Sequence, residues 1–271
     1  MNQKLHFITG LPRSGSTLLS SILKQNSAFH AGVTSPIASI FATVQTALSG
    51  KSEFHSFIDN EARSRILTGL FSSFYRNHVS PTVVFDTNRS WSSKIPALSL
   101  LFPNARFIIC VREISEVINS IESLHQNNPL EPSRIFSYNS AGTIYDRVND
   151  LIKPTGLVGH AYNGIKEAYY GAFTDRIVML PYRSLVQRPD ACMESLYEFL
   201  SETPFKHDFH SVHFSTDEYD RTLGVPGLHT VRPRLEARQI DMVLPRDLLA
   251  QFTNSDFWNN PDTNARHVRV L

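Results

Sequence analysis

The sequence predicts an α/β fold with three layers, in which a central, mostly parallel sheet is flanked by helices. Apolar runs of strand length recur along the chain, and they lack the polar alternation of a sheet with one face in water. Amphipathic segments with helical spacing separate these runs, as in parallel sheets that helices cover on both faces. The chain has 271 residues, of which 41% are hydrophobic and 19% charged, and we expect a single domain over residues 1–271.

Apolar runs without alternation predict the buried strands, which are residues 4–9, 81–86, 106–111 and 176–180. The first strand ends at Gly10 and the second at Asp86. Parallel strands have their carboxyl ends at one edge of the sheet, and ligands of open α/β sheets bind in the crevice there. We therefore look for functional residues directly after these strands.

Apolar positions three and four residues apart predict the helices. The first begins near Thr17, and the others cover about residues 61–74, 114–124, 191–200 and 246–258. The clearest pattern is that of the third, with apolar residues at Ile114, Val117, Ile118, Ile121 and Leu124. The segment 201–244 has no such period and is rich in His and Arg, so we expect a long loop over the edge of the sheet.

Composition argues against several classes of protein. The 26 Lys and Arg residues nearly balance the 25 Asp and Glu residues, and a net charge of +1 argues against a dedicated nucleic-acid binder. No run approaches the roughly 18 apolar residues of a membrane span, and Pro12 and Arg13 come before any signal-peptide apolar region. Cys110 and Cys192 are too few for a disulfide framework or a zinc cluster. We expect a soluble, cytoplasmic protein.

The most informative segment is Gly10-Leu11-Pro12-Arg13-Ser14-Gly15-Ser16-Thr17, between the first strand and the first helix. Such a loop directs backbone N–H groups and the positive end of a helix at a bound anion. Its spacing matches the phosphate-binding P-loop motif GxxxxGK[ST], with Ser16 in place of the lysine. The cation stands earlier, at Arg13, which favours one phosphate with a transferable group over a triphosphate with magnesium. The plain alternative is a structural turn with a chance arginine.

A second anion site is predicted at the end of the strand 106–111. Arg112 follows that strand directly, and Ser120 lies eight residues further, on the next helix. A planar guanidinium and a hydroxyl in this position are able to bind a second phosphate from another direction. Either residue alone is unremarkable, so the prediction depends on their combination with the loop around Arg13.

These elements resemble the sulfotransferases that use 3′-phosphoadenosine 5′-phosphosulfate (PAPS). FITGLPRSGSTLL is similar to their 5′-phosphosulfate loop, and LFPNARFIICVREISEVINSI to their 3′-phosphate element. A third match begins at Tyr182 and follows the pattern Y-x-x-L-x-x-x-P. The resemblance covers about residues 5–200, and it is closest to the branch with the protein-tyrosine sulfotransferases and many bacterial small-molecule enzymes.

The resemblance implies a P-loop NTPase-like three-layer fold and a bacterial enzyme that transfers a sulfuryl group, without a metal, from PAPS to a hydroxyl or amine. The acceptor would be a small molecule or a peptide, the product nucleotide 3′-phosphoadenosine 5′-phosphate (PAP), and the segment 201–244 would cover the site. A homodimer is compatible with this assignment. The residues expected to hold the 5′-phosphosulfate are Arg13, Ser14, Gly15, Ser16 and Thr17. Arg112 and Ser120 would hold the 3′-phosphate, and Tyr182 would support the nucleotide.

Two positions depart from the family pattern. The glutamate that serves as base in tyrosine-modifying and heparan-type members corresponds to Thr34, and the catalytic lysine of the family to about Thr87. Arg89 is therefore the candidate to replace the lysine, while Arg13 is expected to stabilise charge on the leaving phosphate.

The general base has more than one candidate. Asp86 ranks first because it ends a strand beside the loop, although its carboxylate would equally well orient the loop hydroxyls. His229 ranks second because the ordinary pKa of histidine suits a base near neutrality. Among the arginines around His229, we expect Arg232 to contact the nucleotide.

Two other functions remain open. A P-loop kinase or NTPase would use the run that ends at Asp86 as its magnesium-binding strand. A nucleotide-binding protein without catalytic activity would have a degenerate loop, although such a protein would not need both anion sites.

Overall fold

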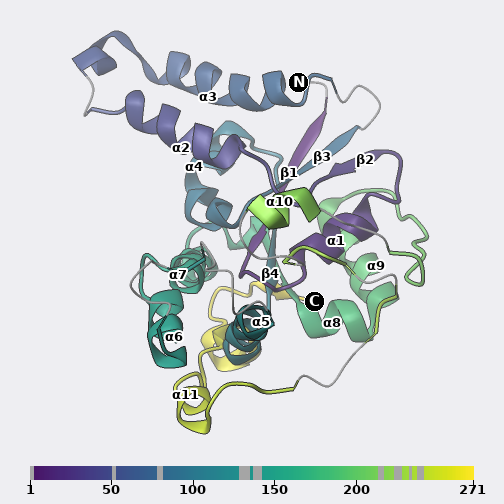
Figure 1. Ribbon diagram of the computed structural model, residues 1–271. Coiled ribbons are helices and arrows are strands. Elements are labelled where there is room, and N and C mark those ends of the chain that lie inside the picture. The colour runs from purple at the N-terminus through teal and green to yellow at the C-terminus, as the bar shows by residue number, and fades with distance from the viewer. Residues whose placement is uncertain are drawn as a thin grey trace.

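The computed structural model describes residues 3–50, 53–77, 82–127, 135–136, 142–212, 217–222, 228–231, 234–236 and 241–271. Its centre is a six-stranded sheet with the order β2-β3-β1-β4-β5-β6, in which all neighbouring strands are parallel (Figure 1). The strands are β1 (Lys4–Gly10), β2 (Phe29–Ala31), β3 (Val83–Thr87), β4 (Phe107–Val111), β5 (Ile177–Pro181) and β6 (Arg269–Val270). The predicted fold class is confirmed.

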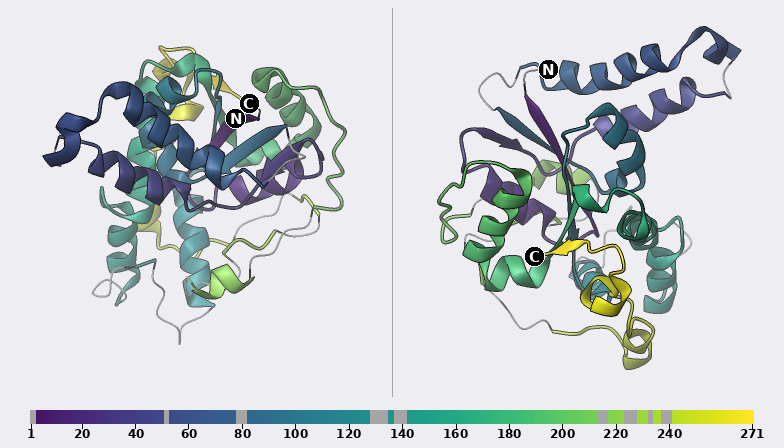
Figure 2. Two further views of the ribbon diagram at one scale, coloured as in Figure 1. Left: turned by 90° about the horizontal axis from the view of Figure 1, so that it is seen from above. Right: turned by 180° about the vertical axis from the view of Figure 1, so that it is seen from behind.

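Helices cover both faces of the sheet (Figures 1 and 2). One face carries α1 (Ser16–Leu23), α8 (Tyr182–Gln187) and α9 (Pro189–Leu200). The other carries α2 (Ile37–Ala47), α3 (Asn60–Phe74), α4 (Ile95–Leu101), α5 (Ile114–Gln126), α6 (Ile144–Ile152), α7 (Leu157–Tyr170) and α11 (Arg246–Ala250). The remaining short helices are α10 (Asp217–Thr222), η1 (Glu53–Phe57), η2 (Arg89–Lys94), η3 (Thr174–Arg176), η4 (Phe257–Asn259) and η5 (Pro261–Thr263).

The two helical layers explain why the strand sequences are apolar throughout. Along β4, Ile109 and Val111 pack into the core on the side of α5, whereas Ile108 and Cys110 pack into the core on the side of α1. All four side chains have no exposed surface. Since successive strand residues point to opposite faces, a strand covered on both sides needs an apolar residue at every position.

Some predicted boundaries are wrong. The helix predicted over 246–258 ends at Ala250, and Asn254 has φ 65°, a left-handed conformation that interrupts a right-handed helix. The segment 201–244, predicted to be irregular, contains the short helix α10. The strands β2 and β6 have three and two residues, too few for a sequence period to show.

The topology determines where ligands bind. β1 lies in the middle of the sheet between β3 and β4. After β1 the chain forms β2 and β3 on one side of it and then β4, β5 and β6 on the other, so the carboxyl end of β1 is a topological switch point. Gly10 and the loop after it stand at this point. Within the described residues, no helix is both long enough and apolar enough to cross a bilayer.

Candidate active site

The loop after β1 depends on two glycines. Gly10 has φ 140°, and a Cβ there would lie 2.0 Å from the carbonyl oxygen of Cys110 on β4. Gly15 has φ 94°, and its Cβ would lie 2.8 Å from Cδ2 of Tyr182. Both positions thus combine a backbone conformation that favours glycine with a close approach of a neighbouring strand or ring.

Arg13 connects the two predicted anion sites. Its Nε donates to Oγ of Ser120 on α5 over 3.1 Å, and its Nη1 donates to the carbonyl oxygen of Leu228. Its backbone has φ 58°, a conformation that costs a non-glycine residue about 1–2 kcal/mol. The loop therefore holds this side chain, at a conformational cost, against the helix of the second anion site.

The hydroxyls of the loop have different surroundings. Ser14 is buried, and its hydroxyl donates to the carbonyl oxygen of Leu11 over 2.6 Å, so its side chain braces the loop. Any contact of Ser14 with a ligand would come through its backbone N–H. Ser16 and Thr17 begin α1 and line the cavity described below. At this end of the helix, their unpaired backbone N–H groups and the helix dipole favour an anion.

Arg112 is the centre of the second anion site. Its Nε donates to Oε2 of Glu116 over 2.8 Å, and its Nη1 donates to the carbonyl oxygen of Arg13 over 3.2 Å. Its guanidinium carbon lies 4.6 Å from the ring centroid of Tyr182. Tyr182 is therefore in contact with both sites, since its ring also lies against Gly15.

A cavity of about 1080 Å³ joins these residues. Its walls come from the loop after β1, the carboxyl ends of the strands, one side of α5, the start of α8 and parts of the segment 201–244. The predicted site residues on its walls are Arg13, Gly15, Ser16, Thr17, Arg89, Arg112, Ser120, Tyr182 and His229. A cavity of this size is large enough for a nucleotide together with a second small ligand.

Asp86 does not lie on the cavity wall. It has no exposed surface, and its carboxylate accepts hydrogen bonds from Ser35, Tyr75 and Trp91, all at 2.8–2.9 Å. Burial raises the pKa of Asp86, and these three donors partly offset the rise. The carboxylate orients neighbouring core side chains, and none of its hydrogen bonds is to a hydroxyl of the loop around Arg13.

His229 lies on the cavity wall and is held by Asp220. Its Nδ1 lies 2.6 Å from Oδ1 of Asp220, and its backbone N–H donates to Oδ2 over 2.8 Å. Asp220 has no exposed surface. Burial lowers the pKa of His229; the Asp220 carboxylate opposes this, and the charges of Arg13 and Arg89 add to the lowering. Burial and the two neighbouring cations thus favour the neutral form of the imidazole.

The remaining predicted positions follow the family pattern only in part. Thr34 and Thr87, the positions that correspond to the family's glutamate and lysine, both line the cavity. Arg89 stands at the start of η2, directly after β3, and also lines it. Arg232 lies outside the described residues. In the part of the chain that the structure describes, no three His, Cys, Asp or Glu side chains gather as metal ligands would.

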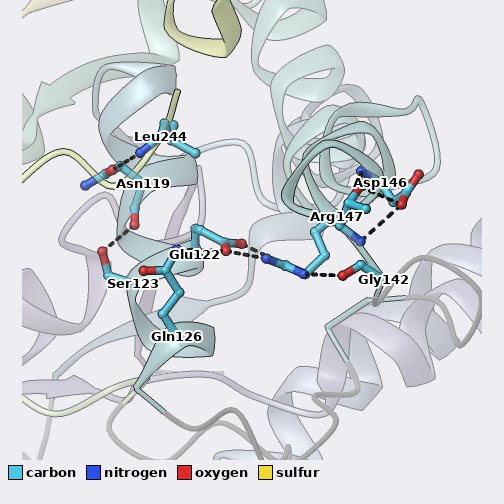
Figure 3. A network of polar contacts seen from close by, with 9 residues as sticks. Asn119, Glu122, Ser123, Gln126, Gly142, Asp146, Arg147 and Leu244 are labelled. Atoms are coloured by element: carbon cyan, nitrogen blue, oxygen red, sulfur yellow. Dashed lines mark hydrogen bonds and ion pairs between the residues drawn. The ribbon is translucent and has the colours of Figure 1, made fainter. Parts of the chain in front are cut away.

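A polar network on α5 holds the chain around Leu244 (Figure 3). Asn119 is fully buried, and its Nδ2 donates to the carbonyl oxygen of Asp241. Its Oδ1 accepts from the backbone N–H groups of Val243 and Leu244, at 2.7 and 3.3 Å. One turn further along, Glu122 forms a buried ion pair with Arg147 of α6.

Three residues of this site were missed by the sequence prediction. Glu116 had a signal, because it lies four residues after Arg112 in the first turn of α5, a spacing at which side chains meet at a helix. Asp220 and Asn119 had none, because their partners are distant in sequence or lie in a segment without periodicity. Only the folded chain brings these side chains together.

A glycine-rich loop at the switch point of a parallel sheet, with a second basic site beside it, is typical of α/β proteins that bind nucleotide phosphates. The model of the sulfotransferase family matches residues 6–206 of the chain. The chain therefore belongs to the sulfotransferase family. No curated protein gives a significant match.

Solved structures share the fold. The sulfotransferase domain of the olefin synthase from Synechococcus PCC 7002 has a TM-score of 0.56 and 19% identity, and the alignment covers 96% of each chain. The sulfotransferase domain from the curacin biosynthetic pathway has a TM-score of 0.56 and 17% identity, over 93% of this chain and 98% of that one. For a sulfotransferase from Alicyclobacillus acidocaldarius the values are 0.54 and 13%, over 100% and 98%.

Proposed function

We propose that the protein transfers a sulfuryl group from PAPS to a hydroxyl or amine of a small molecule or peptide. The observation that carries this proposal is the junction of two anion sites in one cavity, where Arg13 of the loop contacts Ser120 of the second site. A donor with a 5′-phosphosulfate and a 3′-phosphate presents two anionic groups to such a cavity. The family membership of the chain supports the same assignment.

The loop from Gly10 to Thr17 would hold the 5′-phosphosulfate through its backbone N–H groups and the hydroxyls of Ser16 and Thr17. Arg112 and Ser120 would hold the 3′-phosphate, with Tyr182 packed between the two sites. Of the two groups, the 3′-phosphate distinguishes PAPS from ATP. Its proposed ligands are Ser120 of α5 and Arg112, which directly follows β4, and neither belongs to the loop.

In the transfer step, the acceptor oxygen or nitrogen attacks sulfur, and the bond between sulfur and the 5′-phosphate oxygen breaks. The electron pair of that bond leaves with PAP, and the acceptor proton passes to His229. Arg13 and Arg89 stabilise the negative charge that grows on the leaving phosphate oxygen. These two cations act on the pKa of His229, so all three side chains are close enough to interact electrostatically.

We propose His229 in preference to Asp86 as the general base. With the Nδ1 proton directed at Asp220, the basic nitrogen of the imidazole is Nε2. The two contacts from Asp220 fix both the ring and the backbone of His229. Asp86, in contrast, is enclosed in the core and surrounded by donors.

The surroundings of Asp86 also argue against a P-loop kinase. In a kinase this strand-end carboxylate would have to reach magnesium at the phosphates. Here its oxygens face Ser35, Tyr75 and Trp91 in the core, and the loop has Ser16 at the lysine position. The acceptor, the single domain, a homodimer and a cytoplasmic location stay predictions.

Calorimetric titration with PAP and with ATP·Mg tests the proposed donor. We expect PAP to bind at micromolar concentration in the absence of a metal, and ATP·Mg to bind far more weakly because it lacks a 3′-phosphate. Tight binding of ATP·Mg without binding of PAP would contradict the proposed function.

A further inference from the structure

We propose that Glu116 is a positioning residue that sets the preference of the site for nucleotides with a 3′-phosphate, by holding the guanidinium of Arg112. This inference rests on the proposed function, because it assigns the 3′-phosphate to Arg112. Glu116 itself would act through Arg112 and not through a direct bond to the phosphate.

The guanidinium of Arg112 is held from three directions. The Glu116 carboxylate accepts from Nε at 2.8 Å, the backbone carbonyl of Arg13 accepts from Nη1 at 3.2 Å, and the Tyr182 ring lies 4.6 Å from the guanidinium carbon. The exposed fractions of the two paired side chains are 12% for Arg112 and 22% for Glu116. A guanidinium has five N–H donors, so these bonds orient it and still leave N–H groups for a phosphate.

Helix stability does not account for this ion pair. Arg112 stands before the first turn of α5, where a positive charge is unfavourable because the helix dipole is positive there. In pairs four residues apart, the order with the glutamate first is also the more stabilising one. The chain contains such a pair in Glu61 and Arg65 of α3, and there the side chains are 81% and 65% exposed. The pair at Arg112 has the reverse order and is mostly buried.

Three carboxylates stand near the start of α5, and Glu116 is the one that holds Arg112. Burial and the charges of Glu113 and Glu116 raise the pKa of Asp256 to about 6. Glu113 pairs with Arg183 at 3.6 Å, and Asp256 accepts from the backbone N–H of Ile114. The bond to Glu116, the bond to the Arg13 carbonyl and the Tyr182 ring keep the guanidinium on the cavity wall, where Ser120 also lies.

The experiment compares the binding of PAP with that of AMP, which lacks only the 3′-phosphate. For Glu116→Ala we expect about tenfold weaker binding of PAP and AMP binding within twofold of the unmodified chain, because only the 3′-phosphate uses Arg112. Glu116→Gln keeps an acceptor for Nε and should retain most of the PAP affinity. Glu116→Asp keeps the charge, but its shorter side chain moves the carboxylate away from Arg112. Its PAP affinity should therefore be as low as that of Glu116→Ala.

Glu61→Ala is the matched control, because it removes a glutamate from an ion pair of the same spacing away from the cavity. Equal losses of PAP and AMP affinity in Glu116→Ala, or no loss of either, would overturn the inference. If Glu116→Ala does not fold, the ratio of PAP to AMP affinity in Glu116→Gln and Glu116→Asp decides whether Glu116 positions Arg112. Arg112→Ala separates the two hypotheses: if it leaves the ratio of PAP to AMP affinity unchanged, the proposed 3′-phosphate site itself is wrong.

Discussion

The cavity has a proposed donor side, made by the loop from Gly10 to Thr17 and by α5, and a proposed base side around His229, and the two sides are built in different ways. On the donor side, the loop from Gly10 to Thr17 follows the central strand directly, and its form is determined by backbone geometry and close contacts. On the base side, His229 belongs to a segment that side chains hold in place. Leu228 accepts a hydrogen bond from Arg13, and Asn119 fastens residues 241–244. The sheet positions the proposed donor side. The segment of the proposed base side is held by hydrogen bonds from the donor side, from Arg13 of the loop and from Asn119 of α5.

The largest effect is expected from Arg13→Ala, because this side chain contacts both sides. We expect turnover at saturating PAPS to fall by about 10³-fold, since a cation on the leaving phosphate is lost. Arg112→Ala should instead weaken PAP binding and leave turnover at saturation close to that of the unmodified chain. The measurements are release of PAP with a panel of hydroxyl acceptors and calorimetric titration with PAP. Equal losses of turnover in the two variants would contradict the different roles of the two arginines.

The base side is tested by His229→Gln, for which we expect a loss of turnover of about 10²–10³-fold with PAP affinity nearly unchanged.

Asp220→Asn should shift the pH profile of turnover. Asp220 raises the pKa of His229, so its neutralisation lowers that pKa and moves the acidic limb of the turnover profile to lower pH. A limb that stays in place in Asp220→Asn would mean that His229 is not the titrating base.

The anchor of the base side is tested by Asn119→Ala. The substitution leaves the Asp241 carbonyl and the backbone N–H groups of Val243 and Leu244 without their side-chain partner, and we expect the free energy of unfolding to fall by about 2 kcal/mol. Ser123→Ala is the control, because among the described residues its hydroxyl donates within α5, to the carbonyl of Asn119. Urea unfolding measures both. Similar small losses in the two variants would mean that the segment has other, stronger anchors.

The smallest effect concerns the donor side. The pKa of Asp256 is raised to about 6, above the roughly 3.9 of an unfolded aspartate, so ionisation of this residue destabilises the folded chain progressively between those values. Asp256→Asn keeps an acceptor for the backbone N–H of Ile114 and removes the charge. We expect no difference in unfolding free energy near pH 3.5 and a gain of about 1 kcal/mol above pH 6, reduced by solvent screening. A gain that is already complete at pH 3.5 would contradict this origin.

The order and identity of the main elements could be predicted from the sequence because their signals are local. A continuous apolar run indicated β4, apolar spacing indicated α5, and a glycine-bounded loop indicated the phosphate site. The prediction failed where the signal was short or absent, as for the three residues of β2, and where an apolar pattern ran on past the end of a helix, as beyond Ala250.

The sequence by itself therefore determined the proposed donor side, because its strand, loop and helix are consecutive in the chain. Where a strand, a glycine-rich loop and a helix follow one another, backbone N–H groups are directed at an anion. It also placed Arg112 at the end of a strand and Ser120 eight residues further, on the following helix. Only the tertiary structure decided the base side. Asp86 lies near the carboxyl end of β3, where a catalytic carboxylate would stand, yet its side chain points into the core toward Tyr75 and Trp91. His229 meets Asp220, and Arg13 meets Ser120, across contacts that no period along the chain encodes.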